Sequence, residues 1–330
     1  MSPSSTPSRD LGATWQDAMR RGDFPAAWAV SDAVLAARDL TASDDPVLPP
    51  HLRWVWDGRP LDGRRALVRC YHGLGDTLQF ARYLAPLRRR VGALTVEAQP
   101  DLVPLLRALP GPDRVRRTAW FDVHPFDPAR PLPPDEATVE IMELAHALRL
   151  APPAPPYFDL PSGAAPRNGH GLRVGLCWAA GAWLPQRSVP LAALAPLERL
   201  PGVQLVSLQH GPAAADAPAG LFQARLNPGL ASLGLNPAAT VEDTVRLLAR
   251  VDLVLTVDTM IAHLAGALGR PTWLLLKADP DWRWGGGRSP WYPGIRQFRQ
   301  TVAGDWSGPV TAVAAALAAH PGLPGGRAAL

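Results

Sequence analysis

The chain has 330 residues, of which 47% are hydrophobic, enough for two domains with sizeable cores and too many for a disordered protein. The formal net charge is only +4, and no Lys/Arg block with interleaved aromatic residues occurs, so nucleic acid is not an expected partner. Two cysteines, Cys70 and Cys177, cannot form a disulfide framework or a zinc site by themselves. The N-terminus lacks the apolar core of a signal peptide, and no apolar run approaches about 18 residues, so a cytoplasmic protein without a transmembrane segment is expected.

Residues 1–50 are expected to form a disordered leader, over 1–10, and then a helix pair. Helical periodicity from Leu11 to Asp39 breaks at Gly22-Asp23, which resembles the middle of a degenerate tetratricopeptide pair. A single pair is not a repeat array, so the helices are expected to cap the domain that follows.

Residues 51–160 alternate strands and helices as an N-terminal Rossmann-like domain does. The expected elements are a strand at 66–70, a tight loop at 71–76, a helix at 77–90, a strand at 94–96, a helix at 101–108, an irregular stretch at 110–134 and a helix at 136–149.

A proline-dense hinge begins at residue 151, and after it the pattern starts again, so 161–330 is expected to be a C-terminal Rossmann-like domain. Its expected elements are strands at 172–178, 203–208, 253–257 and 272–276 and helices at 241–250 and 261–268. The order predicts an α/β fold of two doubly wound domains facing a cleft.

The stretch 252–276 is a strand–helix–strand unit in which Asp258 and Thr259 supply N-cap chemistry. A helix N-terminus at the carboxyl end of a parallel strand offers N–H groups to an anion. His263 lies one turn further on the same face and can point toward the same ligand. The alternative is that this histidine is structural.

The turn Gly73-Leu74-Gly75-Asp76 could be half of a dinucleotide fingerprint, with Glu97 at the end of the next strand. However, Leu78 occupies the third glycine position, and the Asp76 carboxylate lies where a pyrophosphate would bind. A carboxylate on a tight turn is better suited to a general base. Asp76 could also merely cap the following helix.

Trp178 and Arg187 belong to the loop after the first strand of the second half. An arginine there could neutralise a phosphate, although a loop arginine can also be a plain surface charge. The tryptophans at 282, 284, 291 and 306 could stack a nucleobase, or they could hold the end of the domain together.

Five motifs resemble the glycosyltransferases related to ADP-heptose lipopolysaccharide heptosyltransferases, in particular the bacterial branch often fused to tetratricopeptide repeats. In chain order they are HGLGDTLQFARY, WAAGAWLPQRSVPL, SLQHG, DLVLTVDTMIAHLAGALGRPTWLLL and DWRWGGGRSPWYP. They occur in the family's order and span roughly residues 50–310.

The resemblance implies a GT-B fold with no metal and no other cofactor, with Asp76 as the general base. Asp258, Thr259 and His263 match the donor-binding motif. The chain departs from the family in having Arg187 where a lysine is usual, and Met260 where a small residue is common. The full expected donor-binding set is Gly75, Trp178, Arg187, Gln209, Asp258, Thr259, Met260 and His263.

The sequence therefore predicts a metal-independent, inverting glycosyltransferase of the hexosyl- or heptosyltransferase type that uses a nucleotide-diphosphate sugar. Its acceptor would be a glycan, a lipid-linked molecule or a protein, and its location the cytoplasm or the periphery of the inner membrane. Two alternatives stay open: a non-catalytic nucleotide-sugar-binding protein and an NAD(P)-dependent oxidoreductase.

Overall fold

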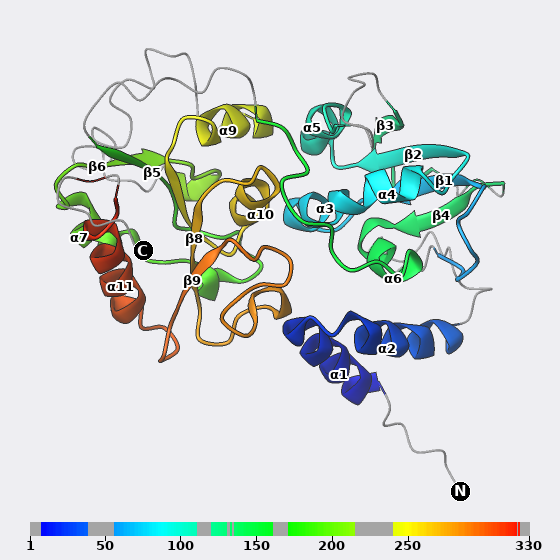
Figure 1. Ribbon diagram of the computed structural model, residues 1–330, viewed down its shortest axis with the longest axis horizontal. Helices are drawn as coiled ribbons and strands as arrows, with labels where there is room; N and C mark the ends of the chain where they lie inside the picture. The colour runs from blue at the N-terminus through cyan, green and yellow to red at the C-terminus, as the bar shows by residue number, and fades with distance from the viewer. Residues whose placement is uncertain are drawn as a thin grey trace, which may run out of the picture. The chain divides into compact units, whose positions relative to one another are not determined.

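The computed structural model describes residues 8–38, 56–110, 120–130, 133, 135–160, 171–214, 240–321 and 323. The chain forms two compact units (Figure 1). Unit 1 takes its described residues from 1–157 and 281–293, and unit 2 takes its described residues from 158–280 and 294–330. The sequence analysis places the domain boundary near residue 160. It does not predict that residues 281–293 belong to unit 1.

Unit 1 contains a parallel four-stranded sheet in the order β3-β2-β1-β4. Its strands are β1 (Arg65–Arg69), β2 (Ala93–Ala98), β3 (Asp122–Pro125) and β4 (Ala137–Glu140). Its α-helices are α1 (Ser8–Arg21), α2 (Phe24–Ala36), α3 (Leu74–Phe80), α4 (Leu84–Arg88), α5 (Val103–Arg107) and α6 (Leu144–Ala147). Its 3₁₀ turns are η3 (Ala81–Tyr83), η4 (Pro100–Leu102), η5 (Ile141–Glu143) and η10 (Trp282–Trp284).

The prediction of one helix over 136–149 is wrong at its start. Residues 137–140 form β4, which pairs in register with β1 and is buried throughout, because sheet pairing outweighs the local helical pattern. Glu140 then caps η5 by accepting a hydrogen bond of 2.7 Å from the N–H of Met142. The stretch expected to be irregular likewise contains β3, which pairs with β2.

The helix expected over 77–90 begins earlier, at Leu74, and is interrupted by η3 before it continues as α4. Gly73 is the N-cap of α3, and Asp76 stands at the third helical position. The predicted tight loop is therefore partly the first turn of a helix. This places the Asp76 side chain beside the free N–H groups of the helix start.

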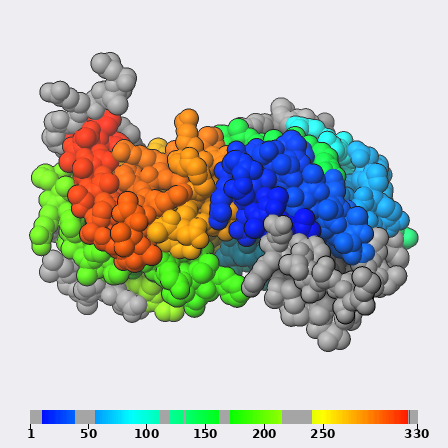
Figure 2. Space-filling model, turned by 90° about the horizontal axis from the view of Figure 1, so that it is seen from below, coloured from blue at the N-terminus to red at the C-terminus, as the bar shows by residue number. Residues whose placement is uncertain are grey.

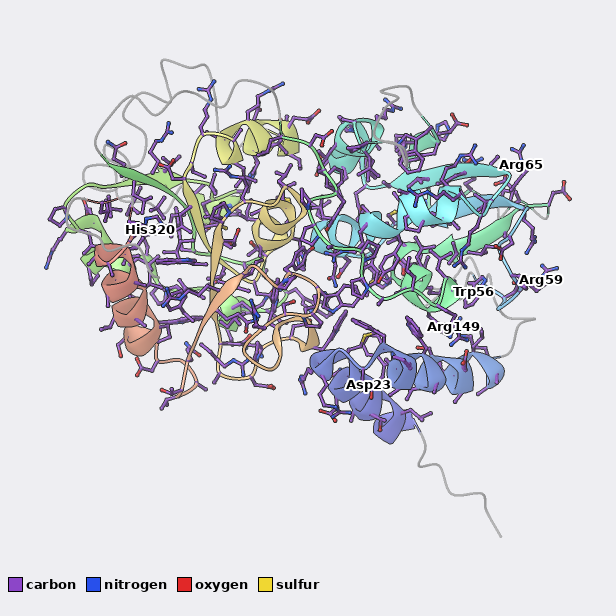
Figure 3. All side chains as sticks on the ribbon, in the orientation of Figure 1. Asp23, Trp56, Arg59, Arg65, Arg149 and His320 are labelled. Atoms are coloured by element: carbon purple, nitrogen blue, oxygen red, sulfur yellow. The ribbon has the colours of Figure 1, made fainter. Side chains whose placement is uncertain are left out.

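Helices α1 and α2 meet at Gly22, whose φ of 72° suits a turn, and Asp23 caps α2. They lie side by side on the surface of unit 1 (Figure 2, blue). Figure 3 shows Arg149 and Trp56 on the side of unit 1 that faces α2. Helix α1 begins at Ser8, inside the stretch expected to be a leader.

Aromatic and charged contacts fix the helix pair on unit 1. Trp15 packs edge-on against Trp282, with ring centroids 5.0 Å apart. On α2, Asp32 pairs with His146 at 2.8 Å and with Arg149. The pair therefore caps this unit, as the sequence predicts.

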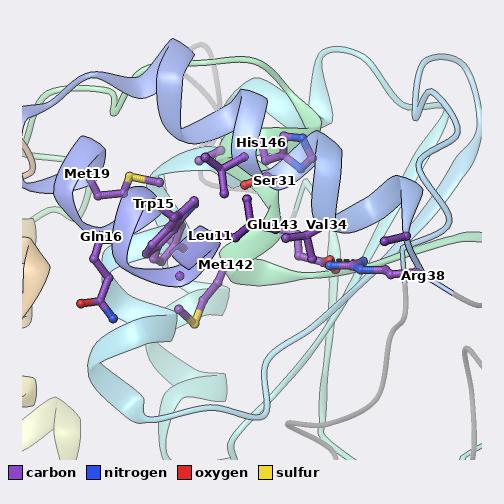
Figure 4. A pocket seen from close by; sticks show the side chains of 15 residues that line it. Leu11, Trp15, Gln16, Met19, Ser31, Val34, Arg38, Met142, Glu143 and His146 are labelled. Atoms are coloured by element: carbon purple, nitrogen blue, oxygen red, sulfur yellow. Dashed lines mark hydrogen bonds and ion pairs between the residues drawn. The ribbon is translucent and has the colours of Figure 1, made fainter. Parts of the chain in front are cut away.

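A pocket of about 730 Å³ remains between the helix pair and the stretch η5–α6 (Figure 4). Trp15 and Met19 line one side, Met142 lines another, and the Arg38–Glu143 ion pair of 3.0 Å closes one end. None of the predicted site residues lines this pocket.

Unit 2 contains a parallel five-stranded sheet in the order β6-β5-β7-β8-β9. Its strands are β5 (Leu172–Cys177), β6 (Val203–Ser207), β7 (Leu253–Val257), β8 (Thr272–Leu276) and β9 (Arg296–Arg299). Its α-helices are α7 (Ala195–Glu198), α9 (Val241–Leu248), α10 (Met260–Ala267) and α11 (Ser307–Ala318). Its 3₁₀ turns are η6 (Pro185–Arg187), η7 (Leu191–Leu194) and η8 (Pro212–Ala214).

The strand–helix–strand unit at 252–276 is confirmed. Strand β7 is buried at every position, and β8 lies beside it in parallel, as a continuous apolar run predicts. Thr259 caps α10, and Thr240 caps α9. The α/β fold class with two parallel sheets is confirmed, whereas β9 and α11 were not expected from the sequence.

The segment 281–293 packs its aromatic side chains inside unit 1. Trp284 and Trp291 are completely buried, and Phe24 of α2 packs against the latter at 5.7 Å between ring centroids. The guanidinium of Arg82 donates a hydrogen bond of 2.8 Å to the carbonyl of Trp291. These contacts favour the structural interpretation of the tryptophans over nucleobase stacking.

Candidate functional site

The carboxyl ends of β5, β6 and β7 bring together the residues predicted to bind a donor in unit 2. Strand β5 lies between β6 and β7, so the segments that follow these three strands meet at one edge of the sheet. Trp178, Gln209 and Asp258 each follow one of the strands within two residues. This is the edge at which open parallel α/β sheets bind ligands.

Gln209 orders the loop that follows β5. Its Oε1 accepts hydrogen bonds from the backbone N–H groups of Trp178 (3.0 Å) and Ala179 (2.8 Å). Its Nε2 donates to the carbonyls of Ala179 (3.1 Å) and His210 (3.0 Å). These bonds use the amide's two donor hydrogens and both acceptor lone pairs. Gln209 is 4% exposed, so the geometry favours a loop-shaping role, while its contact with a donor stays a prediction.

The start of α10 carries the predicted anion-binding element. The Thr259 hydroxyl accepts a hydrogen bond of 3.2 Å from the N–H of Ile261, and Met260 is the first helical residue. His263 lies in the first turn and is buried. Trp178 is buried in the core of the unit.

Arg187 reaches the same place from η6. Its Nη1 lies 3.6 Å from Oδ2 of Asp258, the residue before the cap of α10. Its Nε is buried and has no hydrogen-bond partner among the described residues. A buried N–H without a partner is costly, and an anionic oxygen at this position would satisfy it.

The loop that carries Arg187 also presents Trp183, a residue that the sequence analysis missed. Its side chain is 88% exposed, the most exposed large hydrophobic side chain among the described residues. The only signal in the sequence was a second tryptophan in the motif WAAGAWLPQRSVPL.

The two cysteines are not candidates for nucleophilic chemistry. Burial raises the pKa of the Cys177 thiol to about 11, and it raises the pKa of Cys70 well above its ordinary value. Because the thiolate is the reactive form, both side chains stay inert near neutral pH.

In unit 1, the carboxylate of Asp76 is held at both oxygens. Its Oδ2 accepts a hydrogen bond of 3.0 Å from the N–H of Gly73, and its Oδ1 accepts one of 2.5 Å from Nη2 of Arg283. The Asp76 side chain is still 25% exposed. Gly75 lies beside it in the first turn of α3. Capping and a chemical role are thus compatible for Asp76, and its role as general base stays a prediction.

The same geometry argues against a dinucleotide at the Gly73–Gly75 turn. At the start of α3, the N–H of Gly73 already donates to the carboxylate of Asp76, a residue of the same helix. Glu97, where a ribose-binding carboxylate would be expected, is fully buried and paired with Arg69 (3.0 Å) and Arg130 (2.7 Å). A carboxylate with two arginine partners is unavailable to a ribose hydroxyl.

A second carboxyl group that the sequence analysis missed lies near Asp76. Glu140, at the end of β4, is buried, and its Oε1 has no hydrogen-bond partner among the described residues. Burial raises the pKa of Glu140 well above its ordinary value, and the nearby carboxylates of Glu143 and Asp76 raise it further. Burial therefore favours the protonated form of Glu140, near the more exposed carboxylate of Asp76.

Within the described ranges, no group of three or more His, Cys, Asp or Glu residues is arranged to hold a metal ion. In the same part of the chain, no helix combines the length and apolar character that a membrane span requires.

Residues 206–301 match the family model of glycosyltransferase family 9 (heptosyltransferase). Over this segment the predicted heptosyltransferase resemblance is confirmed. The family 9 segment contains Gln209, the whole Asp258–His263 element and Arg283, whereas Asp76, Trp178 and Arg187 precede it.

The chain is also 28% identical to protein FlbA of Caulobacter vibrioides over 294 residues, which cover 79% of this chain and 48% of that protein. It therefore spans about half the length of this relative.

Two solved structures from E. coli are similar to the chain, and both comparisons cover 76% of it and 97% of the other chain. ADP-heptose LPS heptosyltransferase II is 18% identical, with a TM-score of 0.49. Heptosyltransferase WaaC with ADP is 14% identical, with a TM-score of 0.48.

Proposed function

We propose that this protein is a glycosyltransferase that moves a sugar from a nucleotide-diphosphate donor to a hydroxyl acceptor. The observation that carries the proposal is the N-terminus of α10 with Arg187 beside it, inside and next to the family 9 segment. A helix start and a guanidinium at the same sheet edge form a binding site for a diphosphate.

Within the proposal, unit 2 holds the donor. The first turn of α10, capped by Thr259, and the guanidinium of Arg187 would bind the phosphates and stabilise the charge that grows on the departing diphosphate. His263 would hold the phosphates or the sugar in place, and Asp258 would orient a donor hydroxyl. Trp183 offers a flat, exposed ring for stacking a base or a sugar. Gly75, Trp178, Gln209 and Met260 complete the expected donor set.

Asp76 of unit 1 would act as the general base. It takes the proton of the acceptor hydroxyl while that oxygen attacks the anomeric carbon, and the bond from that carbon to the diphosphate breaks. A single displacement of this kind inverts the anomeric configuration. No step requires a metal ion or another cofactor, because the charge on the leaving group is met by the helix start and Arg187.

The acceptor is a glycan, a lipid-linked molecule or a protein, and the expected location is the cytoplasm, including the periphery of the inner membrane. The helix pair α1–α2, joined at Gly22-Asp23, supports the proposed association with tetratricopeptide repeats. A nucleotide-sugar-binding protein without turnover is the competing function.

A panel of nucleotide sugars tests the donor half of the proposal. A matching donor at about 100 times its dissociation constant should stabilise the protein by about 2.7 kcal/mol, seen as a rise in Tm. ADP-heptose belongs in the panel because of the family 9 match. The contrary result is a Tm that no nucleotide sugar raises, with a rise for NADH or NADPH, which would support the oxidoreductase alternative.

A further inference from the structure

Arg283 reaches the predicted base from far along the chain. It belongs to η10, on the segment that returns to unit 1, and it is buried. Its Nη2 donates to Oδ1 of Asp76 at 2.5 Å, its Nε to Oε1 of Gln79 at 2.5 Å, and its Nη1 to Oδ1 of Asp281 at 2.9 Å. The planar guanidinium therefore uses three different N–H directions for three acceptors.

The contact with α3 is geometrically specific. Asp76 and Gln79 are three residues apart, so they lie on the same face of the helix. Arg283 spans both side chains, while the N–H of Gly73 holds the other oxygen of Asp76 at 3.0 Å. Each carboxylate oxygen thus has one fixed partner, and the remaining lone pairs of this partly exposed group stay available.

We propose that Arg283 is a positioning residue for catalysis: it fixes the orientation of the Asp76 carboxylate, so that the lone pairs left open can accept the proton of the acceptor hydroxyl. The inference rests on the proposed function, in which Asp76 is the general base. It gives the motif DWRWGGGRSPWYP a role in the chemistry through Arg283, while the aromatic residues of the motif serve packing.

Two substitutions test whether the three contacts of Arg283 position Asp76. Arg283→Gln removes the guanidinium, so kcat should fall by about tenfold to a hundredfold. Arg283→Lys keeps a positive charge but cannot span all three acceptors, so kcat should fall in this variant as well. Donor affinity should change less than about threefold in both variants, because donor binding is assigned to unit 2.

Arg82→Lys is the matched control for a general loss of stability. Arg82 is also a buried arginine that binds the returning segment, but it donates to the carbonyls of Gln79 and Trp291 rather than to Asp76. It should lower Tm while kcat stays close to that of the parent. An equal kcat in the parent and in Arg283→Gln would overturn the inference, as would a fall of equal size in Arg82→Lys.

The inference and the proposed function fail in different ways. If the parent turns over a donor and Arg283→Gln keeps its kcat, only the role of Arg283 is wrong. If the parent turns over no donor, the proposed function is wrong, and hydrogen exchange at the N–H of Gly73 still decides whether Arg283 holds the Asp76 carboxylate in place. This N–H donates to Asp76, so it should exchange faster in Arg283→Gln than in the parent, and equal exchange in both proteins would contradict the claim.

Discussion

The guanidinium of Arg187 lies 3.6 Å from the carboxylate of Asp258, two residues before the first helical residue of α10. This ion pair holds a cation beside the helix start that is proposed to bind the diphosphate. A phosphate group would compete with Asp258 for the guanidinium and satisfy its buried Nε.

Arg187→Ala should therefore weaken binding of a nucleotide diphosphate by about 1.5–3 kcal/mol, because a charged hydrogen bond is lost. Binding of the corresponding nucleoside should change little, and calorimetry with both ligands measures the difference. Arg173→Ala is a matched control, since Arg173 pairs with Asp252 at the same distance of 3.6 Å at the opposite end of β5. Equal losses for nucleoside and diphosphate would place Arg187 away from the phosphates.

Gln209→Ala should lower the free energy of unfolding by about 1–3 kcal/mol, because the buried N–H groups of Trp178 and Ala179 lose their acceptor. Urea unfolding measures this loss. Gln186→Ala, an exposed glutamine on the same loop, should have little effect. Similar stability of the two variants would show that Gln209 does not hold the loop.

Glu140 predicts a pH dependence of stability. Since burial raises the pKa of Glu140 in the folded protein above its ordinary 4.5, ionisation is easier in the unfolded chain. The stability of the parent should therefore fall as pH rises above about 4.5 and continue to fall until the folded-state group ionises. Glu140→Gln cannot ionise, so it should gain stability relative to the parent across that window.

Urea unfolding of both proteins between about pH 4 and about pH 8 measures this difference. A constant difference across that range would mean that Glu140 titrates in the folded protein as it does in the unfolded chain.

Much of unit 2 could be predicted because its signals are local. The apolar run at 253–257 and the cap at Thr259 are decided within a few residues, and the structure has both elements there. The helix expected over 136–149 was wrong because the strand character of residues 137–140 comes from pairing with β1, about 70 residues earlier in the chain.

The surroundings of Asp76 could not be predicted for the same reason. Its contact with Arg283 joins residues 207 positions apart, and no periodicity or motif spacing encodes such a contact. Glu140 was assigned to a helix, so its place at the end of a strand, near Asp76, was missed as well. The sequence suggested Asp76 as a cap of the helix that follows it, whereas in the structure Gly73 is the N-cap and Asp76 is the third helical residue, whose carboxylate accepts the N–H of Gly73.

Sugar transfer should persist in an excess of a metal chelator such as EDTA, because the proposed leaving-group charge is stabilised by Arg187 and the start of α10. The rate of nucleotide diphosphate release with and without chelator measures this. Loss of activity in chelator, followed by recovery with a divalent cation, would contradict the proposed mechanism.

The most direct test of the proposed function is the turnover of Asp76→Asn. A general base contributes roughly 10²–10⁴-fold to a rate, so turnover should fall at least about a hundredfold. Donor affinity should stay within a few-fold, because donor binding is assigned to unit 2. The substituted side chain can still accept the N–H of Gly73, and Arg283 keeps its bonds to Gln79 and Asp281, so the protein should remain folded. Unchanged turnover in a folded Asp76→Asn protein would remove Asp76 from the chemistry and contradict the mechanism proposed here.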